Sequence, residues 1–367
     1  MSQAFHGGGI RQAEARFGLP AESFIDFSSN VNVLAPTVAM AVWAEWRSEI
    51  GRYSEPDSKG LAEQLAGFYH VSPGHIVPTA GASEALYLSA QLFAGSKVAV
   101  LEPAFSDYSR AFSRLPCLLD RILLEPDLWD RPTTLSADRL DPFDVVVLGN
   151  PNNPTGSFQP LNELTRLFDQ RWTRPKRWII DEAFIEFVIG SERETLLGQL
   201  TNYPSLIIVR SLTKSWRIPG LRLGFLATAG PIQRLRQMQP PWSINGIVQA
   251  WAKHFLVEAR RPEYLASLKA LTDLREDFQN SLRRIPGIRV HSSAANFLLV
   301  ELTDVSLDAT RLYTELGHRG ILVRVCDSFY GMPKGRFLRV AVRSALENNR
   351  FLKAFCAVCA NLVGRAA

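Results

Sequence analysis

The sequence is poor in cysteine and contains no long apolar run. Four cysteines occur in 367 residues, without the paired spacings of a disulfide framework: Cys117, Cys326, Cys356 and Cys359. We therefore expect reduced thiols. No stretch of about 18 uncharged apolar residues is present, which is the length that a membrane span needs, and residues 1–10 lack the apolar core of a signal peptide. These absences predict a soluble, cytoplasmic protein with no membrane partner.

A strong charge of one sign is also missing. The 41 Lys and Arg residues exceed the 36 Asp and Glu residues only slightly, giving a net charge of +5. The one dense basic run, RWTRPKR (171–177), precedes a predicted strand, so we interpret it as a solvated loop or helix end and expect no nucleic-acid partner. A small anionic substrate fits this sign equally well. Because the chain has no cysteine-rich C-terminal extension, we expect no metal site.

Short apolar runs bounded by turn residues do recur, and segments with helical spacing lie between most of them. The predicted strands are KVAVLEP (97–103), DVVVLGNP (144–151), RWIIDEAF (177–184) and SLIIVRS (205–211). Helical spacing is found at 83–95 and 161–172. This alternation is typical of an α/β fold with a mainly parallel sheet covered on both faces. Ligands of such sheets bind beyond the carboxyl ends of the strands, where polar residues gather in this chain.

The pattern changes from about residue 245. A long charged helix (258–284) is followed by three apolar runs, ANFLLVEL, GILVRVC and GRFLRVAV, and by an amphipathic helix after Ser344. We predict a large domain over 36–244 and a smaller α+β domain over 245–367, with an N-terminal segment, 1–35, that packs with the small domain. A chain with 46% hydrophobic residues is long enough for two cores.

Four motifs stand in order at the ends of the predicted strands. NPNNPTG (150–156) follows one strand, DEAF (181–184) ends the next, SLTK (211–214) ends the third, and Arg222 comes eight residues after Lys214. Taken singly, these motifs are a tight turn, a capping carboxylate and a solvated lysine. The ordered set resembles the signature of pyridoxal-phosphate (PLP) enzymes of the aspartate aminotransferase fold type, also called fold type I.

This resemblance implies a role for each motif residue. Lys214 matches the amine that holds the aldehyde cofactor as a Schiff base and shuttles protons. Asp181 matches the carboxylate that keeps the pyridine nitrogen protonated, and Asn153 the amide that bonds the ring hydroxyl. The implied donors to the cofactor phosphate are Ser211, Arg222 and the amides of Ala82 and Ser83.

Two aromatic residues are implied by the same resemblance. Phe105, in EPAFSDY, matches the aromatic side chain that stacks on the cofactor ring. Tyr53, in GRYSEPD, matches a tyrosine that in relatives reaches the phosphate of the neighbouring subunit. The second correspondence implies a homodimer.

A finer resemblance points to the threonine-phosphate decarboxylase subfamily, which supplies aminopropanol phosphate for the cobalamin nucleotide loop. The stretches that carry it span 6–352: HGGGIR, DFSSNVN, DEAF, RSLTKSWRIPGLRLGF, PPWSINGIVQAW and RVAVRSALENNRFL. Phe184 stands where aminotransferases of this fold commonly have a tyrosine. The chain departs from the subfamily pattern at Asn32-Val33-Leu34-Ala35. The choice between threonine phosphate and serine phosphate as the substrate therefore stays open.

The subfamily resemblance also implies substrate ligands. Arg339 matches the arginine that binds the α-carboxylate bidentately, and Arg324 matches the position that binds the substrate phosphate. His6 and Asn32 are weaker candidates for the same phosphate. The alternatives are a histidinol-phosphate-type aminotransferase and a non-catalytic descendant of the fold, which the intact lysine, aspartate and arginine set argues against.

Overall fold

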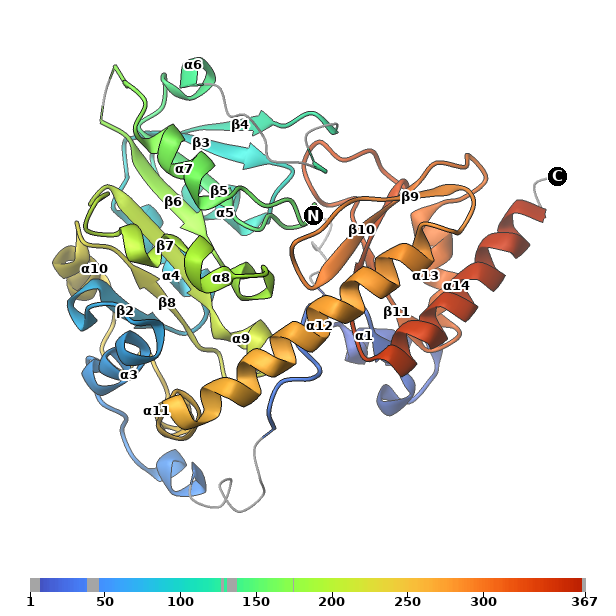
Figure 1. Ribbon diagram of the computed structural model, residues 1–367, viewed down its shortest axis with the longest axis horizontal. Coiled ribbons are helices and arrows are strands. Elements are labelled where there is room, and N and C mark those ends of the chain that lie inside the picture. Colours follow the sequence, from blue (N-terminus) through green and yellow to red (C-terminus); the bar gives the residue numbers. More distant parts are fainter. Residues whose placement is uncertain (1–6, 38–45, 127–128, 131–136, 174, 365–367) are drawn as a thin grey trace.

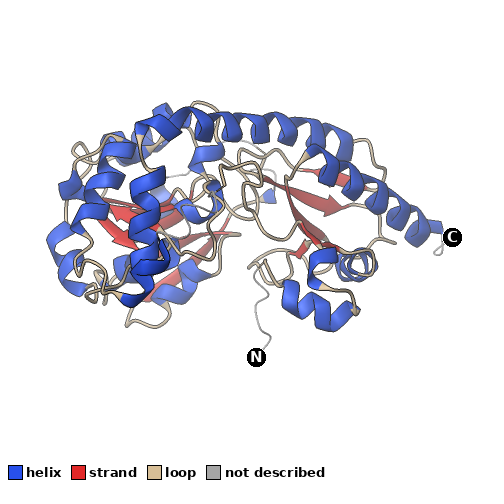
Figure 2. Cartoon of the chain, turned by 90° about the horizontal axis from the view of Figure 1, so that it is seen from below, coloured by secondary structure: helices blue, strands red, loops and turns tan. Residues whose placement is uncertain are grey.

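The structure is a computed structural model that describes residues 7–37, 46–126, 129–130, 137–173 and 175–364. A seven-stranded sheet and a four-stranded sheet form the centres of two parts, and the long helix α12 (Arg261–Leu282) runs from the first part to the second (Figure 1). Figure 2 shows the two groups of strands apart, each with helices packed around it. The domain boundaries given above stay a prediction.

The large sheet is mainly parallel, as the alternation of strands and helices predicted. Its order is β2-β8-β7-β6-β5-β3-β4, and β8 is antiparallel to both of its neighbours. The strands are β2 (Ile76–Thr79), β3 (Lys97–Glu102), β4 (Leu118–Leu123), β5 (Val145–Gly149), β6 (Arg177–Asp181), β7 (Leu206–Ser211) and β8 (Gly224–Ala227).

Helices cover both faces of this sheet, so alternate residues of its strands belong to two separate cores. Val145 and Val147 pack with α4 (Ala82–Gln91), α5 (Asp107–Phe112) and α10 (Ile232–Met238). Val146 and Leu148 belong to the core that holds α3 (Lys59–Tyr69), α7 (Leu161–Phe168), α11 (Gly246–Phe255) and α12. The central strands therefore contribute side chains to a core on each side.

The small sheet is antiparallel, in the order β12-β13-β10-β9. Its strands are β9 (Ile288–Val290), β10 (Phe297–Leu302), β12 (Arg324–Val325) and β13 (Phe337–Ala341), and its helices are α13 (Ala309–Gly317) and α14 (Ala345–Gly364). The N-terminal strand β1 (Ile25–Asp26) pairs with β11 (Ile321–Leu322), next to this sheet. Residues distant in the sequence therefore meet here. Other α-helices in the described part of the chain are α1 (Ile10–Phe17), α6 (Ala137–Leu140), α8 (Ser191–Glu194) and α9 (Leu212–Ser215).

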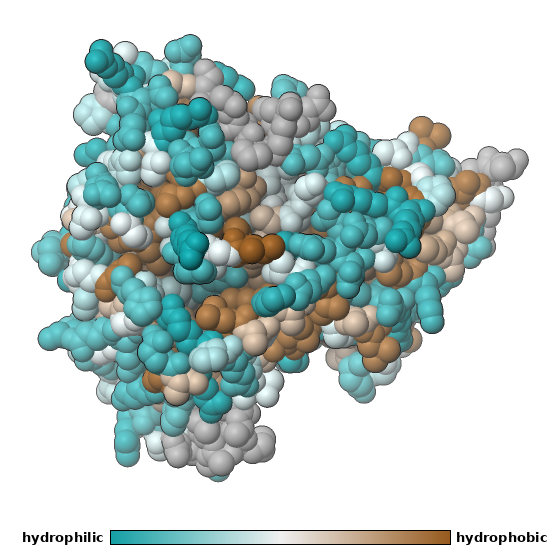
Figure 3. Space-filling view, in the orientation of Figure 1, coloured by the Kyte–Doolittle hydropathy of each residue, from teal (hydrophilic) through white to brown (hydrophobic). Residues whose placement is uncertain are grey.

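The surface of the molecule is mainly polar on the face drawn in Figure 3, where hydrophilic side chains surround smaller hydrophobic patches. Among the described residues, no helix combines the length and the apolar character that crossing a membrane requires.

Strand β8 approaches the start of α4 so closely that only glycine fits at one position. A Cβ atom on Gly224 would lie 2.6 Å from the carbonyl oxygen of Arg210, 2.7 Å from the carbonyl carbon of Gly81 and 2.8 Å from the amide nitrogen of Ala82. All three are backbone atoms, which cannot move aside without moving β7 or α4. Gly224 therefore sets the distance between the sheet and the N-terminus of α4.

We predict that Gly224→Ala lowers the free energy of unfolding by about 1–3 kcal/mol, because the added methyl group overpacks a backbone contact. Urea unfolding of the apoprotein measures the change. The matched control is Gly67→Ala in α3, where no described heavy atom lies within 4 Å of the new Cβ atom; it should raise the stability by about 0.5–1 kcal/mol, since alanine is the better helix former. Equal urea midpoints for Gly224→Ala and wild type would contradict the tight contact.

Candidate active site

A cavity of about 400 Å³ lies at the carboxyl ends of the parallel strands, between the two sheets. Its walls come from the start of α4, the ends of β5, β6 and β7, the N-terminal segment and the strands β12 and β13. Most of the site residues predicted from the sequence line it: Ala82, Ser83, Phe105, Asn153, Asp181, Ser211, Lys214, Arg222, Arg324 and Arg339. Four of these are cationic, so the cavity suits an anionic ligand.

One end of the cavity is a cradle of hydrogen-bond donors. Gly81, with φ of +89°, precedes α4, and no described side chain caps the first amides of this helix. Arg222 lies against the turn: Nη2 donates to the carbonyl of Ala80 at 3.4 Å, and a Cβ atom on Gly81 would meet that nitrogen at 2.5 Å. The Ser211 and Thr213 hydroxyls share a hydrogen bond of 2.7 Å. Free helix amides beside an arginine form a site for a phosphate group.

Asp181 is buried on the floor of the cavity. Its Oδ1 accepts from the Ala183 amide at 2.8 Å and its Oδ2 from the Tyr108 hydroxyl at 2.9 Å. Burial raises the pKa of Asp181, and Lys214, the Ala183 amide and Tyr108 oppose the rise. A carboxylate in such a site attracts a proton on a nearby ring nitrogen more strongly than it would in water. Sequence analysis missed Tyr108, although it lies three residues after Phe105 at the start of a helix, where such residues share a face.

Lys214 projects into the cavity from the short helix α9, directly after β7. Burial lowers the pKa of Lys214 to about 8, with Arg222 and Arg339 adding to the effect and Asp181 opposing it. The uncharged, nucleophilic amine is therefore far more populated at neutral pH than in an ordinary lysine. Nζ lies 4.9 Å from the centre of the Phe184 ring.

Arg339 joins three parts of the chain at the opposite wall. From β13 its Nη1 donates to Oδ1 of Asn153 at 2.6 Å, and its Nη2 donates to the carbonyl of Ser28 at 2.9 Å. Nε is buried without a hydrogen-bond partner in the described part of the chain. Burial lowers the pKa of Arg339 to about 10. The Asn153 oxygen accepts this hydrogen bond, which leaves the Asn153 NH₂ group to donate to a ligand.

Arg324 lies beside Arg339, on the neighbouring strand of the small sheet. The two residues are direct partners in the β12–β13 register, so their side chains leave the same face of the sheet. Nη2 of Arg324 donates to the Ser328 hydroxyl at 2.6 Å, and the guanidinium carbon lies 5.5 Å from the centre of the Phe329 ring. Burial lowers the pKa of Arg324. No motif in the sequence had identified Ser328, which also lines the cavity.

Three predicted residues are not brought together with this group. His6 lies outside the described residues. Asn32 is buried away from the cavity lining: its Nδ2 donates to the Ser215 carbonyl at 3.1 Å and to the Ser267 hydroxyl at 3.0 Å, and its Oδ1 accepts from the Leu34 amide. Its polar groups hold the backbone near Lys214. Tyr53 is 89% exposed and lies against Trp242 on the surface, with ring centres 5.5 Å apart.

These features fit PLP. The cavity offers a donor cradle for a phosphate, a buried carboxylate for a pyridine nitrogen, an amine of lowered pKa for an aldehyde, and Phe105 on one wall. The left-handed backbone of Arg222, with φ of +63°, is an uncommon conformation for a non-glycine residue and is frequent at ligand sites.

Comparison with known proteins agrees with this assignment. The family model "Aminotransferase class I and II" matches residues 22–355. Threonine-phosphate decarboxylase of Salmonella typhimurium is 30% identical over 354 residues, covering 95% of each chain. L-serine phosphate decarboxylase of Sulfurospirillum multivorans is 31% identical over 301 residues, covering 79% of this chain and 75% of the relative.

A solved structure gives the same picture. The histidinol-phosphate aminotransferase of Clostridium acetobutylicum superposes with a TM-score of 0.79 at 28% identity, covering 91% of this chain and 99% of that one. The fold is therefore that of PLP enzymes of fold type I, and the chain belongs to the aminotransferase class I and II family of enzymes, with pyridoxal 5'-phosphate as its cofactor.

Proposed function

We propose that the enzyme decarboxylates L-threonine O-3-phosphate to (R)-1-amino-2-propanol O-2-phosphate and carbon dioxide, for the nucleotide loop of cobalamin. The observation that carries the proposal is the pair of arginines, Arg324 and Arg339, which face each other on adjacent strands and line one cavity. Directly opposed residues of an antiparallel pair leave the same face of the sheet side by side, with Cβ atoms roughly 4.5–5.5 Å apart. Two cationic side chains that enter one cavity from adjacent positions match a small molecule with two anionic groups.

A phosphorylated amino acid is such a molecule, because its carboxylate and its phosphate sit on neighbouring carbon atoms. Nε of Arg339 has no hydrogen-bond partner among the described residues and can donate to a carboxylate. Arg324, with Ser328 beside it, offers charge-assisted donors for a phosphate. Binding at both ends fixes the rotation of the substrate about its Cα–N bond. The similarity to threonine-phosphate decarboxylase supports a rotation that releases the carboxylate.

The chain's own residues supply the remaining steps. When bound, the cofactor supplies an electron sink for the negative charge that forms at the substrate Cα. We propose that Lys214 attaches the cofactor through its uncharged amine and later gives a proton to the same Cα. Asp181, held by Tyr108 and the Ala183 amide, retains the proton on the ring nitrogen. Phe184 places an apolar ring next to the Lys214 amine.

Two other substrates stay open. L-Serine O-phosphate differs from the proposed substrate by one methyl group, and a serine-phosphate decarboxylase is among the similar proteins. A histidinol-phosphate-type transaminase would use 2-oxoglutarate, which is also a dianion that the arginine pair can bind, and the solved structure of such an enzyme superposes closely.

The homodimer stays a prediction that the exposed Tyr53 supports. A tyrosine with 89% of its surface exposed, whose ring lies tilted against the half-exposed Trp242, has its hydroxyl available to a second subunit. We propose that Tyr53 reaches the phosphate in the partner's cavity.

The reaction assay uses the purified holoenzyme with L-threonine O-3-phosphate, L-serine O-phosphate and L-histidinol phosphate, the last with 2-oxoglutarate. We expect carbon dioxide from L-threonine O-3-phosphate and little glutamate from histidinol phosphate. Faster release from L-serine O-phosphate would move the proposal to that substrate. Glutamate formation without carbon dioxide from either phosphoamino acid would overturn decarboxylation and leave the fold and cofactor unchanged.

Lys214→Ala should abolish the covalent attachment of the cofactor, because no other amine lines the described cavity. Sodium borohydride should fix the cofactor to the wild-type chain, seen as a mass increase and a peptide modified at Lys214. The variant should show neither, although it can still bind PLP non-covalently. Lys176→Ala, at a buried lysine that is not part of the cavity lining, is the control for lysine removal. A reducible adduct in Lys214→Ala would contradict the assignment.

Arg324→Ala should lower kcat/KM for the phosphorylated substrate roughly a hundredfold, which corresponds to a loss of about 3 kcal/mol of transition-state stabilisation. The reason is that a dianion loses a charge-assisted partner in a partly desolvated site. The loss for unphosphorylated L-threonine should be much smaller. Arg319→Ala, at an exposed residue of the same domain, controls for the loss of one positive charge. Equal losses for both substrates would show that Arg324 does not bind the phosphate.

A further inference from the structure

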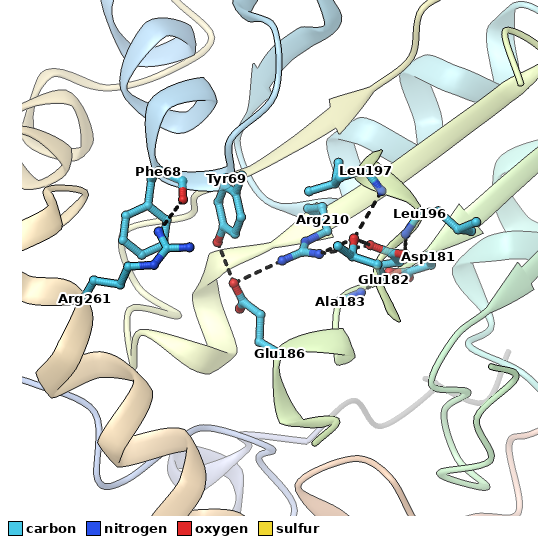
Figure 4. A network of polar contacts seen from close by, with 11 residues as sticks. Phe68, Tyr69, Asp181, Glu182, Ala183, Glu186, Leu196, Leu197, Arg210 and Arg261 are labelled. Carbon is cyan, nitrogen blue, oxygen red and sulfur yellow. Dashed lines mark hydrogen bonds and ion pairs between the residues drawn. The ribbon is translucent and has the colours of Figure 1, made fainter. Parts of the chain in front are cut away.

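A buried network centred on Arg210 lies behind the cavity (Figure 4). Arg210 is 3% exposed and stands next to the last residue of β7. Its Nη1 donates to Oε2 of Glu182 at 2.9 Å, and its Nη2 donates to Oε1 of Glu186 at 3.1 Å. Both carboxylates are buried, with 1% and 9% of each residue exposed. The reaction proposed above uses none of these three charges.

The two carboxylates of the network also accept hydrogen bonds from other groups. Glu182 accepts from the Leu196 amide at 2.8 Å and from the Thr195 hydroxyl at 2.6 Å. Glu186 accepts from the Tyr69 hydroxyl at 2.6 Å, and the Arg210 guanidinium carbon lies 4.9 Å from the Tyr69 ring centre. Two carboxylates around one guanidinium therefore hold a fixed geometry with strong, directional bonds.

Each anchor of this network is a close chain neighbour of a residue in the cavity. Glu182 follows Asp181, Arg210 precedes Ser211, and Glu186 comes two residues after Phe184, whose ring lies beside Lys214. Successive strand residues point to opposite faces, so Arg210 lies behind the cavity that Ser211 lines. The Glu182 amide donates to the Val209 carbonyl at 2.8 Å, and the Arg210–Glu182 pair continues this link between β6 and β7.

Stability alone gives a weak reason for such a network. Burying ions costs desolvation, and replacing a buried ion pair by well-packed hydrophobic residues of similar volume is often neutral or stabilising. A fixed separation between the two strand ends is a different benefit, because catalysis depends on the placement of groups to within about 1 Å. Figure 4 shows the network reaching from Tyr69 to Glu182, with Asp181 next to Glu182.

We propose that Arg210 is a positioning residue, which through Glu182 and Glu186 fixes the separation between Asp181 at the end of β6 and Lys214 after the end of β7. The network holds the two groups that act on opposite ends of the cofactor ring system. This role is independent of which substrate the enzyme uses.

The test replaces the whole network without leaving a buried charge unpaired, in the triple variant Arg210→Met, Glu182→Gln, Glu186→Gln. The measurements are thermal unfolding of the apoprotein, the circular dichroism of the cofactor's visible band, and kcat and KM for the substrate that the wild-type enzyme turns over. Free PLP is achiral, so this dichroism reports how the protein holds the ring. We expect a similar unfolding temperature, a changed dichroism, a kcat lower by about tenfold or more, and a KM within about twofold of wild type.

Two single variants complete the design. Tyr69→Phe removes one hydrogen bond at the far end of the network and leaves Arg210 bound to both carboxylates, so its kcat and dichroism should match wild type. Arg210→Lys keeps the charge but loses the planar fork, and it should show the same direction of change as the triple variant. Wild-type dichroism and kcat in a folded triple variant would overturn the proposal. If the triple variant does not fold, wild-type values in Arg210→Lys would overturn it.

Discussion

The burial of charge at the carboxyl edge of the large sheet is the constraint on which the site depends. Lys214 and Asp181 line the same cavity, and burial shifts the pKa of each so that its uncharged form is favoured. Their mutual attraction opposes both shifts, so neither group takes the value of an isolated buried ion. The result is an amine that can react and a carboxylate that attracts a proton. The buried apolar strands hold both groups in place despite the cost of desolvating them.

The small sheet completes the site by adding Arg324 and Arg339 to the cavity that Lys214 and Arg222 line from the side of the large sheet. Arg339 contacts Asn153 on the large sheet's side and Ser28 in the N-terminal segment, so one guanidinium ties three separate parts of the chain. Arg324 lowers the pKa of Arg339 further, because two like charges disfavour each other. An anionic substrate bound between them would relieve this repulsion. Substrate binding and the contact between the two sheets are therefore linked through the same side chains.

Sequence patterns located the fold and most of the cavity, because both depend on local signals. The central strands β5, β6 and β7 are continuous apolar runs, and the motif residues follow their ends directly. The edge strand β4 was not predicted, since it is half-exposed and carries Asp120 and Arg121 among its apolar residues. Asn32 was a weaker candidate for the substrate phosphate, and its amide donates to backbone and side-chain partners more than 180 positions along the chain. Ser328 was missed because only the fold brings it to Arg324.

Side chains alternate between the two faces of a strand, which explains why the motifs at the strand ends include residues that the reaction does not use. Asp181 and Ser211 face the cavity, and their neighbours Glu182 and Arg210 form an ion pair behind it. A slip of one residue in the β6–β7 register, in which Asp181 pairs with Val209, would exchange the two faces of one strand. It would place a glutamate in the cavity and an aspartate opposite Arg210, with a different reach in each place. The same register therefore specifies both the site and the ion pair that supports it.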